Sequence, residues 1–206
     1  MEIESASLPW KSVYKILIGA IVPRPIGWIS TVNEHGQPNL APFSFFNAVC
    51  ANPPTILFCP MIRSFNSQPK DTLQNVSATG EFVVNIVSGT LVEKMNATSI
   101  EASSDLNEFD FAGLTPTPSF IVKPPRVAES PIHFECKLNQ IVRINDEPGG
   151  GSVVIGTILH IHVDENVLIG ENKINLPALN PVGRLAGNSY VRITDVFDLE
   201  RPPARL

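Results

Sequence analysis

Two long runs decide the fold of this chain, IHFECKLNQIVRI (residues 132–144) and SVVIGTILHIHVDENVL (residues 152–168). Both are rich in β-branched residues, which pack well on the pleated surface of a strand. Between them lies Asp-Glu-Pro-Gly-Gly-Gly (residues 146–151), a composition typical of turns. The pattern predicts an antiparallel hairpin of two long strands.

Shorter runs on both sides of this hairpin predict further strands at residues 26–33, 39–48, 55–61, 81–87 and 190–198. Turn residues such as those at 34–36 and 52–54 separate them. Helices are fewer, at residues 11–18, 69–77 and 90–98. At least seven strands without regular strand-helix alternation predict a mainly β protein with a closed antiparallel barrel.

A doubly wound nucleotide-binding fold fits this sequence poorly. A dinucleotide fingerprint needs Gly-x-Gly-x-x-Gly at the start of a helix, whereas Gly149, Gly150 and Gly151 lie between two predicted strands. The glycine cluster is therefore interpreted as a turn.

Length and composition favour one globular domain spanning residues 1–206. The chain is 43% hydrophobic and 17% charged, too apolar for a disordered protein, and it has no apolar run of the ~20 residues that span a bilayer. Its net charge of -5 disfavours nucleic-acid binding. The acidic N-terminus lacks the order of elements of a secretory signal, so a cytoplasmic location is expected.

The cysteines Cys50, Cys59 and Cys136 are odd in number and widely spaced. This spacing suits neither a disulfide framework nor a Cys-x-x-Cys site. Each cysteine lies in an apolar stretch, where it behaves as a small hydrophobic residue. We therefore expect buried free thiols.

A candidate anion site lies in PMIRSFNSQPKDT (residues 60–72), just before and at the start of a predicted helix. A helix N-terminus with free amides, hydroxyl groups and cations suits a phosphate. The candidate ligands are Arg63, Ser64, Ser67, Lys70 and Thr72. Asp71 would repel a phosphate directly, so we interpret it as a helix cap or as a partner that orients Lys70 or Arg63. Ordinary loop charges at a surface helix are the alternative.

A second candidate lies in NLAPFSFFN (residues 39–47), where Ser44, Phe45, Phe46 and Asn47 follow a proline in a predicted strand. Because successive side chains of a strand point to opposite faces, Phe45 and Phe46 cannot both line one face. One can pack in the core while the other, with Ser44 or Asn47, meets the edge of a ligand ring. Two core phenylalanines with a turn asparagine explain the aromatic residues equally well.

The sequence supports a metal site or a hydrolytic site less well. His160 and His162 are two residues apart in a predicted strand and share a face, but no third ligand is evident, so we predict no metal site. The alternatives are that both histidines lie on a rim of the barrel that faces solvent, or that one of them reaches a cofactor. No Gly-x-Ser-x-Gly elbow is present, and no residue is nominated as catalytic.

Several of these motifs occur in a recognisable order. PRPIGWIST (residues 23–31), a turn with glycine, NLAPFSFFNAV, NPPTILF, KDTLQN and EFVVNIV resemble the flavin reductase-like family with its FMN-binding split barrel. The resemblance is close from residue 18 to residue 87 and looser as far as VGRLAGNSYVRI near the C-terminus. It implies an antiparallel split β-barrel homodimer with one FMN per subunit at or near the interface. It also implies an oxidoreductase that passes electrons from NADH or NADPH to flavin or another acceptor.

Carried over by position, the resemblance implies that Trp28, Ser30 and Thr31 lie beside the flavin. Ser44, Phe45, Phe46 and Asn47 would lie along its ring, and Arg63, Lys70 and Thr72 by its phosphate. Arg184 and Tyr190 resemble late cofactor or nicotinamide contacts of the family, although a solvated arginine beside a packed aromatic residue is equally compatible with the sequence. The alternative function for the same barrel is a non-catalytic flavin carrier or an electron-transfer flavoprotein reduced by a partner.

Overall fold

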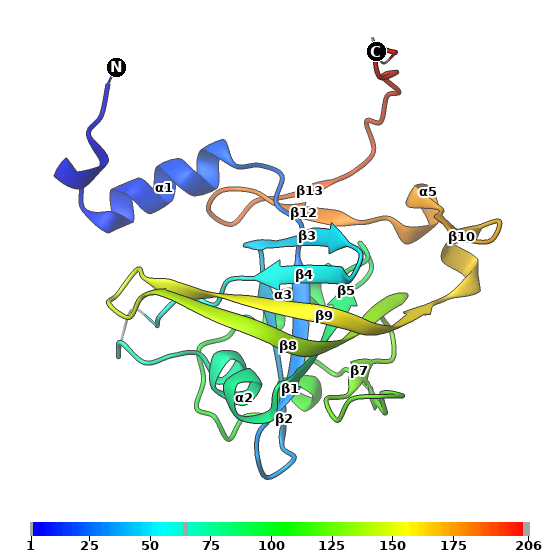
Figure 1. Cartoon of the computed structure of the whole chain (residues 1–206), viewed down its shortest axis with the longest axis horizontal. Helices are drawn as coiled ribbons and strands as arrows, with labels where there is room; N and C mark the ends of the chain where they lie inside the picture. Colours follow the sequence, from blue (N-terminus) through cyan, green and yellow to red (C-terminus); the bar gives the residue numbers. More distant parts are fainter. Residues whose placement is uncertain (1, 64–65, 204–206) are drawn as a thin grey trace.

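The computed structural model describes residues 2–63 and 66–203 and is built around a seven-stranded antiparallel sheet (Figure 1). Across the sheet the order is β2-β1-β5-β8-β9-β4-β3. β2 and β3 form its two edges, so the barrel is split rather than closed by a last ladder of hydrogen bonds. The strands of this sheet are β1 (Gly27–Val32), β2 (Pro38–Phe43), β3 (Phe46–Ala51), β4 (Pro54–Phe58), β5 (Glu81–Ile86), β8 (Ile132–Asn145) and β9 (Gly151–Val163).

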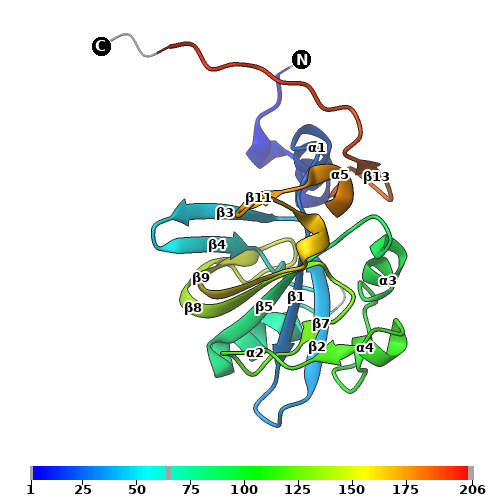
Figure 2. The same cartoon turned by 90° about the vertical axis from the view of Figure 1, so that its right-hand side faces the viewer.

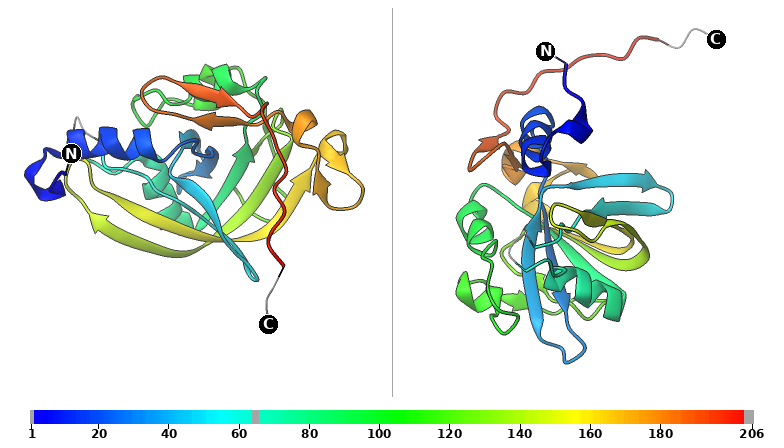
Figure 3. Two further views of the ribbon diagram at one scale, coloured as in Figure 1. Left: turned by 90° about the horizontal axis from the view of Figure 1, so that it is seen from above. Right: turned by 90° about the vertical axis from the view of Figure 1, so that its left-hand side faces the viewer.

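Short helices and two-stranded pairs surround the barrel. Figure 2 shows α3 (Val92–Ala97) and α4 (Glu108–Phe111) beside β1 and β2. Figure 3 shows α1 (Trp10–Ala20) running across the top of the molecule. The remaining elements are η1 (Ser5–Ser7), α2 (Asp71–Thr79), β6 (Pro116–Thr117), β7 (Arg126–Val127), η2 (Glu165–Val167), β10 (Leu168–Ile169), β11 (Lys173–Ile174), α5 (Leu176–Leu179), β12 (Val182–Arg184) and β13 (Tyr190–Arg192).

The predicted hairpin is confirmed as β8 and β9, which pair from Ile132↔Val163 to Asn145↔Gly151. Its second strand is shorter than predicted. The side chain of Asp164 accepts a hydrogen bond from the backbone N–H of Asn166 and so begins η2. This local bond ends the strand, although the apolar pattern continues to residue 168.

Two other strand predictions were wrong in extent. Residues 39–48 form two strands, β2 and β3, because the chain bends at Ser44 and Phe45. The carbonyl of Phe45 accepts a hydrogen bond from Cys59 N, which attaches the bend to the end of β4. The last predicted strand, 190–198, ends at Arg192 in the short β13.

Hydrophobic side chains fill both faces of β1. Trp28 belongs to a cluster with residues of α3 and α4, whereas Ile29 belongs to the cluster inside the barrel. Inside the barrel the rings of Phe43, Phe58 and Phe82 form a chain with centroid distances of 5.1 and 5.3 Å. All six residues of β1 are buried, so its polar side chains need partners inside the protein.

The cysteines are free thiols, as expected, but only Cys136 is buried. Cys50 is exposed because it lies on the edge strand β3, and Cys59 is half-buried. Among the described residues, no helix combines the length and apolar character needed to cross a membrane.

Candidate functional site

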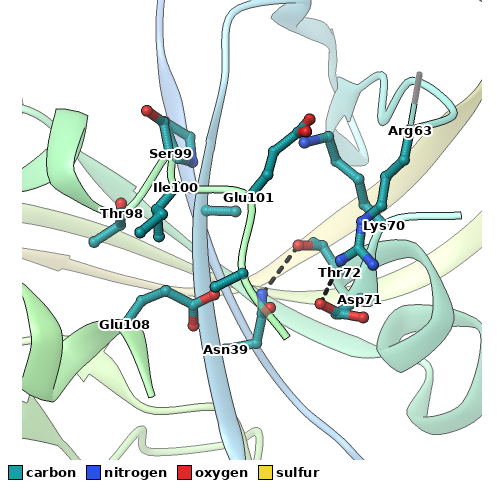
Figure 4. Close-up of a pocket in the computed structure, with 13 residues that line it drawn as sticks. Asn39, Arg63, Lys70, Asp71, Thr72, Thr98, Ser99, Ile100, Glu101 and Glu108 are labelled. Carbon is teal, nitrogen blue, oxygen red and sulfur yellow. Dashed lines mark hydrogen bonds and ion pairs between the residues drawn. The ribbon is translucent and has the colours of Figure 1, made fainter. Parts of the chain in front are cut away.

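A small cavity of about 60 Å³ lies where three segments distant in sequence meet (Figure 4). One wall comes from β2, one from the loop before α2 and the first turn of that helix, and one from residues 98–102 with α4. The lining residues are Asn39, Ala41, Pro42, Arg63, Lys70, Asp71, Thr72, Thr98, Ser99, Ile100, Glu101, Ala102 and Glu108. We call this the first cavity. It brings together four predicted site residues, Arg63, Lys70, Asp71 and Thr72.

Hydrogen bonds hold two of these side chains in place. Arg63 forms an ion pair with Asp71, which matches the interpretation of Asp71 as an orienting partner rather than a cap. The Thr72 hydroxyl accepts a hydrogen bond of 3.0 Å from the Asn39 amide, which joins α2 to β2. The guanidinium and the hydroxyl are therefore positioned before any ligand arrives.

Lys70 is the remaining cation of the first cavity. Among the described residues its ammonium forms no hydrogen bond or ion pair. Burial lowers the pKa of Lys70. The positive charge of Arg63 also lowers this pKa, whereas the carboxylates of Glu101 and Asp71 act to raise it. A partly desolvated ammonium without a close partner gains from an anionic ligand.

Glu108 adds a carboxylate to the same cavity. Burial raises its pKa, against the effect of the Leu40 backbone N–H, which donates a hydrogen bond of 3.1 Å to Oε2.

A second cavity adjoins the first and shares Pro42 and Ser99 with it. Arg184 and Tyr190 line this second cavity together with Ser44. The Arg184 guanidinium lies 4.5 Å from the centre of the Tyr190 ring, and the Tyr190 hydroxyl donates a 3.0 Å hydrogen bond to Asn96 Oδ1. The two side chains are thus a stacked pair on a cavity wall.

A third cavity lies under α1 and is mostly apolar. Ser44, Phe45, Phe46 and Asn47 line it, and Ser44 also lines the second cavity. Phe46 packs against the cluster inside the barrel, while Phe45 reaches a further groove beside Trp10. The expectation that Phe45 and Phe46 cannot both line one face was wrong, because the chain bends at Ser44 and Phe45 and both half-buried rings line the third cavity.

Arg24 connects the segments around the second and third cavities and was not among the predicted site residues. Its guanidinium is buried and donates hydrogen bonds to the carbonyls of Ile18, Ile21 and Leu185 and a longer one, 3.3 Å, to the Ser44 hydroxyl. It therefore binds the end of α1, the turn between β12 and β13, and the bend between β2 and β3. Its place beside Pro23 and Pro25 was the available signal in the sequence.

Trp28, Ser30 and Thr31 require a correction, because their side chains are fully buried and line none of the described cavities. Trp28 Nε1 donates to Thr98 Oγ1 at 2.9 Å, and Ser30 Oγ donates to the Pro125 carbonyl. Thr31 Oγ1 accepts a hydrogen bond from Asn75. These residues lie behind the cavity walls and stabilise them through hydrogen bonds. Trp28 does so by its bond to Thr98, which lines the first cavity.

Of the other two predicted anion ligands, Ser67 does not line the first cavity. Ser67 is exposed and its backbone N–H bonds to the Arg63 carbonyl. Ser64 lies outside the described residues. The cavity wall formed by residues 98–102 and Glu108 was not predicted either. In the sequence this segment shows only a group of hydroxyl and carboxyl side chains, without a periodic pattern that would place them in a site.

His160 and His162 share one face of β9, as predicted, but belong to a separate network. Glu135 is fully buried; its carboxylate accepts a hydrogen bond from His162 and others from the backbone N–H groups of residues 120–122. His160 stacks on Phe120 with 5.1 Å between ring centres. In the described part of the chain no three His, Cys, Asp or Glu residues are grouped so as to hold a metal ion.

Comparisons with known proteins identify the family of this chain. The model of the flavin reductase like domain matches residues 19–177. The chain belongs to the flavin reductase-like family. An uncharacterized protein of Aquifex aeolicus is 44% identical over 181 residues, covering 88% of this flavin reductase-like chain and 90% of its own.

Two solved structures extend the comparison. Nitrilotriacetate monooxygenase component B from Bacillus cereus is 33% identical with a TM-score of 0.91, and the match covers 97% of this chain and 98% of that one. The 2-nitrobenzoate 2-nitroreductase NbaA of Pseudomonas fluorescens is 30% identical with a TM-score of 0.87, over 98% and 96% of the two chains. The flavin reductase-like chain is thus a mainly β split barrel and a flavin-related oxidoreductase.

Proposed function

We propose that this protein binds FMN in the joined cavities and passes electrons from NADH or NADPH to flavin or to another acceptor. In this proposal the phosphate occupies the first cavity, the ribityl chain passes Pro42 and Ser99, and the ring lies beside Ser44. The chain acts as one domain and as a homodimer. A cytoplasmic location remains a prediction from the N-terminal sequence.

The observation that carries the proposal is the pair of cations at the start of α2. Among the described residues Lys70 forms no hydrogen bond or ion pair, although the carboxylate of Glu101 lies near it (Figure 4), and Arg63 is held in the same cavity by Asp71. The first backbone N–H groups of a helix lack partners in a preceding turn and favour an anion. A phosphomonoester fits this site because it brings a double negative charge in a compact group. The small volume suits one end of a ligand rather than a whole nucleotide.

The second and third cavities suit the remainder of the cofactor. Flavin needs polar groups for its ribityl chain and ring edge and a flat apolar wall for the ring. Ser44 and Asn47 supply polar groups, and Phe45 supplies an aromatic wall. Arg184 and Tyr190 lie on the opposite side of Ser44, in the second cavity, where we propose the nicotinamide side of the site.

When bound, flavin supplies the redox chemistry by taking electrons from a reduced nicotinamide and giving them to the acceptor. The protein's own residues bind and orient. Lys70 and Arg63 balance the phosphate charge, Thr72 holds the first turn of α2 against β2, and Arg24 keeps Ser44 at the bend. None of these roles requires a proton transfer by the protein.

Replacing Lys70 by alanine tests the phosphate assignment. A charge-assisted hydrogen bond contributes ~1.5–3 kcal/mol, so we expect Lys70→Ala to raise the Kd for FMN by ~10- to 100-fold. Riboflavin lacks the phosphate, and its Kd should stay unchanged. Fluorescence titration of both flavins measures the two constants, and turnover at saturating FMN should change less than affinity. Thr72→Ala should act in the same direction.

Lys173→Ala is the matched control, because Lys173 is an exposed lysine on β11, outside the cavities. An unchanged Kd for FMN in Lys70→Ala would refute the phosphate assignment. An equal loss for FMN and riboflavin would show that Lys70 acts on another part of the ligand.

Mixing the flavin-loaded protein with NADH or NADPH separates a reductase from a carrier. Bleaching of the flavin absorbance band indicates reduction by the nicotinamide. A band that persists with both nicotinamides indicates a flavin carrier or a protein reduced by a partner. This result is independent of the titration of Lys70→Ala.

A further inference from the structure

The first cavity contains more negative than positive side chains, although its proposed ligand is an anion. The charged lining residues are two cations and three carboxylates, Arg63, Lys70, Asp71, Glu101 and Glu108. Asp71 is paired with Arg63, and Glu108 accepts a hydrogen bond from a backbone N–H group. Among the described residues, Glu101 forms neither a hydrogen bond nor an ion pair. Its carboxylate therefore remains available to act on a ligand.

Glu101 lies at the mouth of the first cavity. Of the five charged lining residues it is the exposed one, whereas the other four are half-buried. Ser99 and Ile100 are also exposed, so residues 99–101 form the side of the cavity that opens to solvent. The Glu101 carboxylate points toward the Lys70 ammonium (Figure 4), and its negative charge acts to raise the pKa of Lys70. A ligand phosphate beside Lys70 would thus have Glu101 as its neighbour on the solvent side.

The end of α3 fixes the backbone that carries this carboxylate. Thr98 accepts a hydrogen bond from the buried Trp28 ring, and the N–H of Ile100 donates a 3.3 Å hydrogen bond to the carbonyl of Ala97. Glu101 follows directly after this turn. The side chain is therefore held at the mouth by its backbone and not by contacts of its own carboxylate.

The two common flavin nucleotides differ at the atoms that would reach this mouth. The phosphate of FMN is a monoester and ends the molecule. In FAD the same phosphorus is joined to a second phosphate, which carries its own negative charge and continues to adenosine. In the proposed function the ribityl chain enters past Pro42 and Ser99, so the second phosphate would leave by the remaining exposed side, at Ile100 and Glu101.

We propose that Glu101 determines which flavin the site accepts. Its carboxylate repels the second phosphate of a flavin dinucleotide at the mouth of the first cavity, whereas the terminal phosphate of FMN stays inside, beside Lys70. A like charge that meets only the wrong ligand gives specificity without adding affinity for the right one. The inference rests on the proposed function, because it takes the phosphate to lie in the first cavity.

Glu101→Gln tests the proposal, because glutamine keeps the shape of glutamate and removes its charge. The Kd for FAD should fall ~10-fold or more, since a like charge no longer opposes the second phosphate. The Kd for FMN should fall only ~2- to 5-fold, because exposed charges interact weakly. The Kd for riboflavin should stay unchanged. Fluorescence titration measures all three constants, and an unchanged ratio of the FAD and FMN constants overturns the proposal.

Glu93→Gln is the matched control, because Glu93 is an exposed glutamate of α3 that lines none of the described cavities. It should leave the three constants unchanged. Glu101→Ala separates charge from size: a gain in FAD affinity in Glu101→Ala but not in Glu101→Gln would show exclusion by size and overturn the proposal. High salt should reduce the preference of the parent protein for FMN over FAD and have less effect on the preference of Glu101→Gln.

The roles of Lys70 and Glu101 can fail separately. If Lys70→Ala leaves the Kd for FMN unchanged, the phosphate assignment and the role of Glu101 are refuted together. If Lys70→Ala weakens FMN binding while Glu101→Gln leaves the preference for FMN over FAD unchanged, the phosphate assignment stands and the role of Glu101 is refuted. The circular dichroism spectrum of Glu101→Gln should match that of the parent protein, since the exposed carboxylate forms no hydrogen bond in the described chain.

Discussion

Replacing Glu135 by glutamine should destabilise the protein strongly without altering its flavin site. The Glu135 carboxylate has no exposed surface and accepts hydrogen bonds from Phe120 N at 2.7 Å, Ile121 N at 2.6 Å and Val122 N at 3.2 Å. His162 Nε2 lies 2.6 Å from Oε1, the oxygen that also accepts the hydrogen bond of Phe120 N. A glutamine keeps one accepting oxygen but turns an NH₂ group toward donors that it cannot satisfy.

The magnitude follows from the pKa of Glu135. Burial acts to raise this pKa, but the N–H groups of Phe120 and Ile121, then His162 and Val122, outweigh it and lower the pKa from 4.5 to about 2. A difference of about 2.5 pKa units corresponds to ~3 kcal/mol of stabilisation of the charged form. For a chain of this length ~3 kcal/mol lowers Tm by ~6–12 °C.

The same network predicts the pH dependence of stability. Because the folded pKa lies below the unfolded value, the stabilisation is complete above pH ~4.5 and is lost as the pH falls toward ~2. In Glu135→Gln this acid-dependent component should disappear. Urea unfolding followed by circular dichroism between pH 7 and the acid limit measures both effects.

Glu147→Gln is the matched control, because Glu147 is an exposed glutamate in the turn between β8 and β9. It should leave stability within ~0.5 kcal/mol of the parent protein. A loss below ~1 kcal/mol in Glu135→Gln, or an unchanged acid profile, would refute the assigned network. The Kd for FMN in the folded variant should equal that of the parent, since Glu135 lines none of the described cavities.

Two further substitutions test the bend between β2 and β3. Arg24→Lys should lower Tm and raise the Kd for FMN several-fold, because one lysine ammonium cannot donate hydrogen bonds to the three carbonyls and to Ser44 at the same time. Unchanged values in thermal melts and flavin titrations would refute the connecting role of Arg24. Gly27→Ala should cost ~1–3 kcal/mol in urea unfolding, because its Cβ would lie 2.6 Å from the Phe46 ring; a stability equal to that of the parent would show that Phe46 can move aside.

The sequence predicted most reliably the elements whose structure is decided locally. The hairpin of β8 and β9 follows from β-branched runs around a glycine turn, and α2 was expected where a proline precedes a short apolar pattern. The charged cluster of Arg63, Lys70 and Asp71 was identified for the same reason: its members are close in sequence and remain close in the fold.

What the sequence did not predict depends on contacts between distant segments. The bend at Ser44 follows from Arg24, which is 20 residues away, and from Leu185, which is 161 residues from Arg24. Trp28, Ser30 and Thr31 were placed beside the ligand by position from the family resemblance, whereas β1 is covered on both faces. Covering of a strand by other elements leaves no periodic signal in its own sequence.

These contacts explain why the site lies where it does. The first cavity uses β2, α2 and the segment after α3, and the second uses the bend at Ser44 and the pair Arg184–Tyr190. Arg24 lines the third cavity and bonds to Ser44, which the second and third cavities share, and to Leu185 after β12. A ligand that reaches the second and third cavities would therefore contact segments whose relative position one guanidinium maintains. Because that guanidinium bonds mainly to backbone carbonyls, the neighbouring side chains can vary without loss of the framework, and the residues that meet the ligand are free to set its specificity.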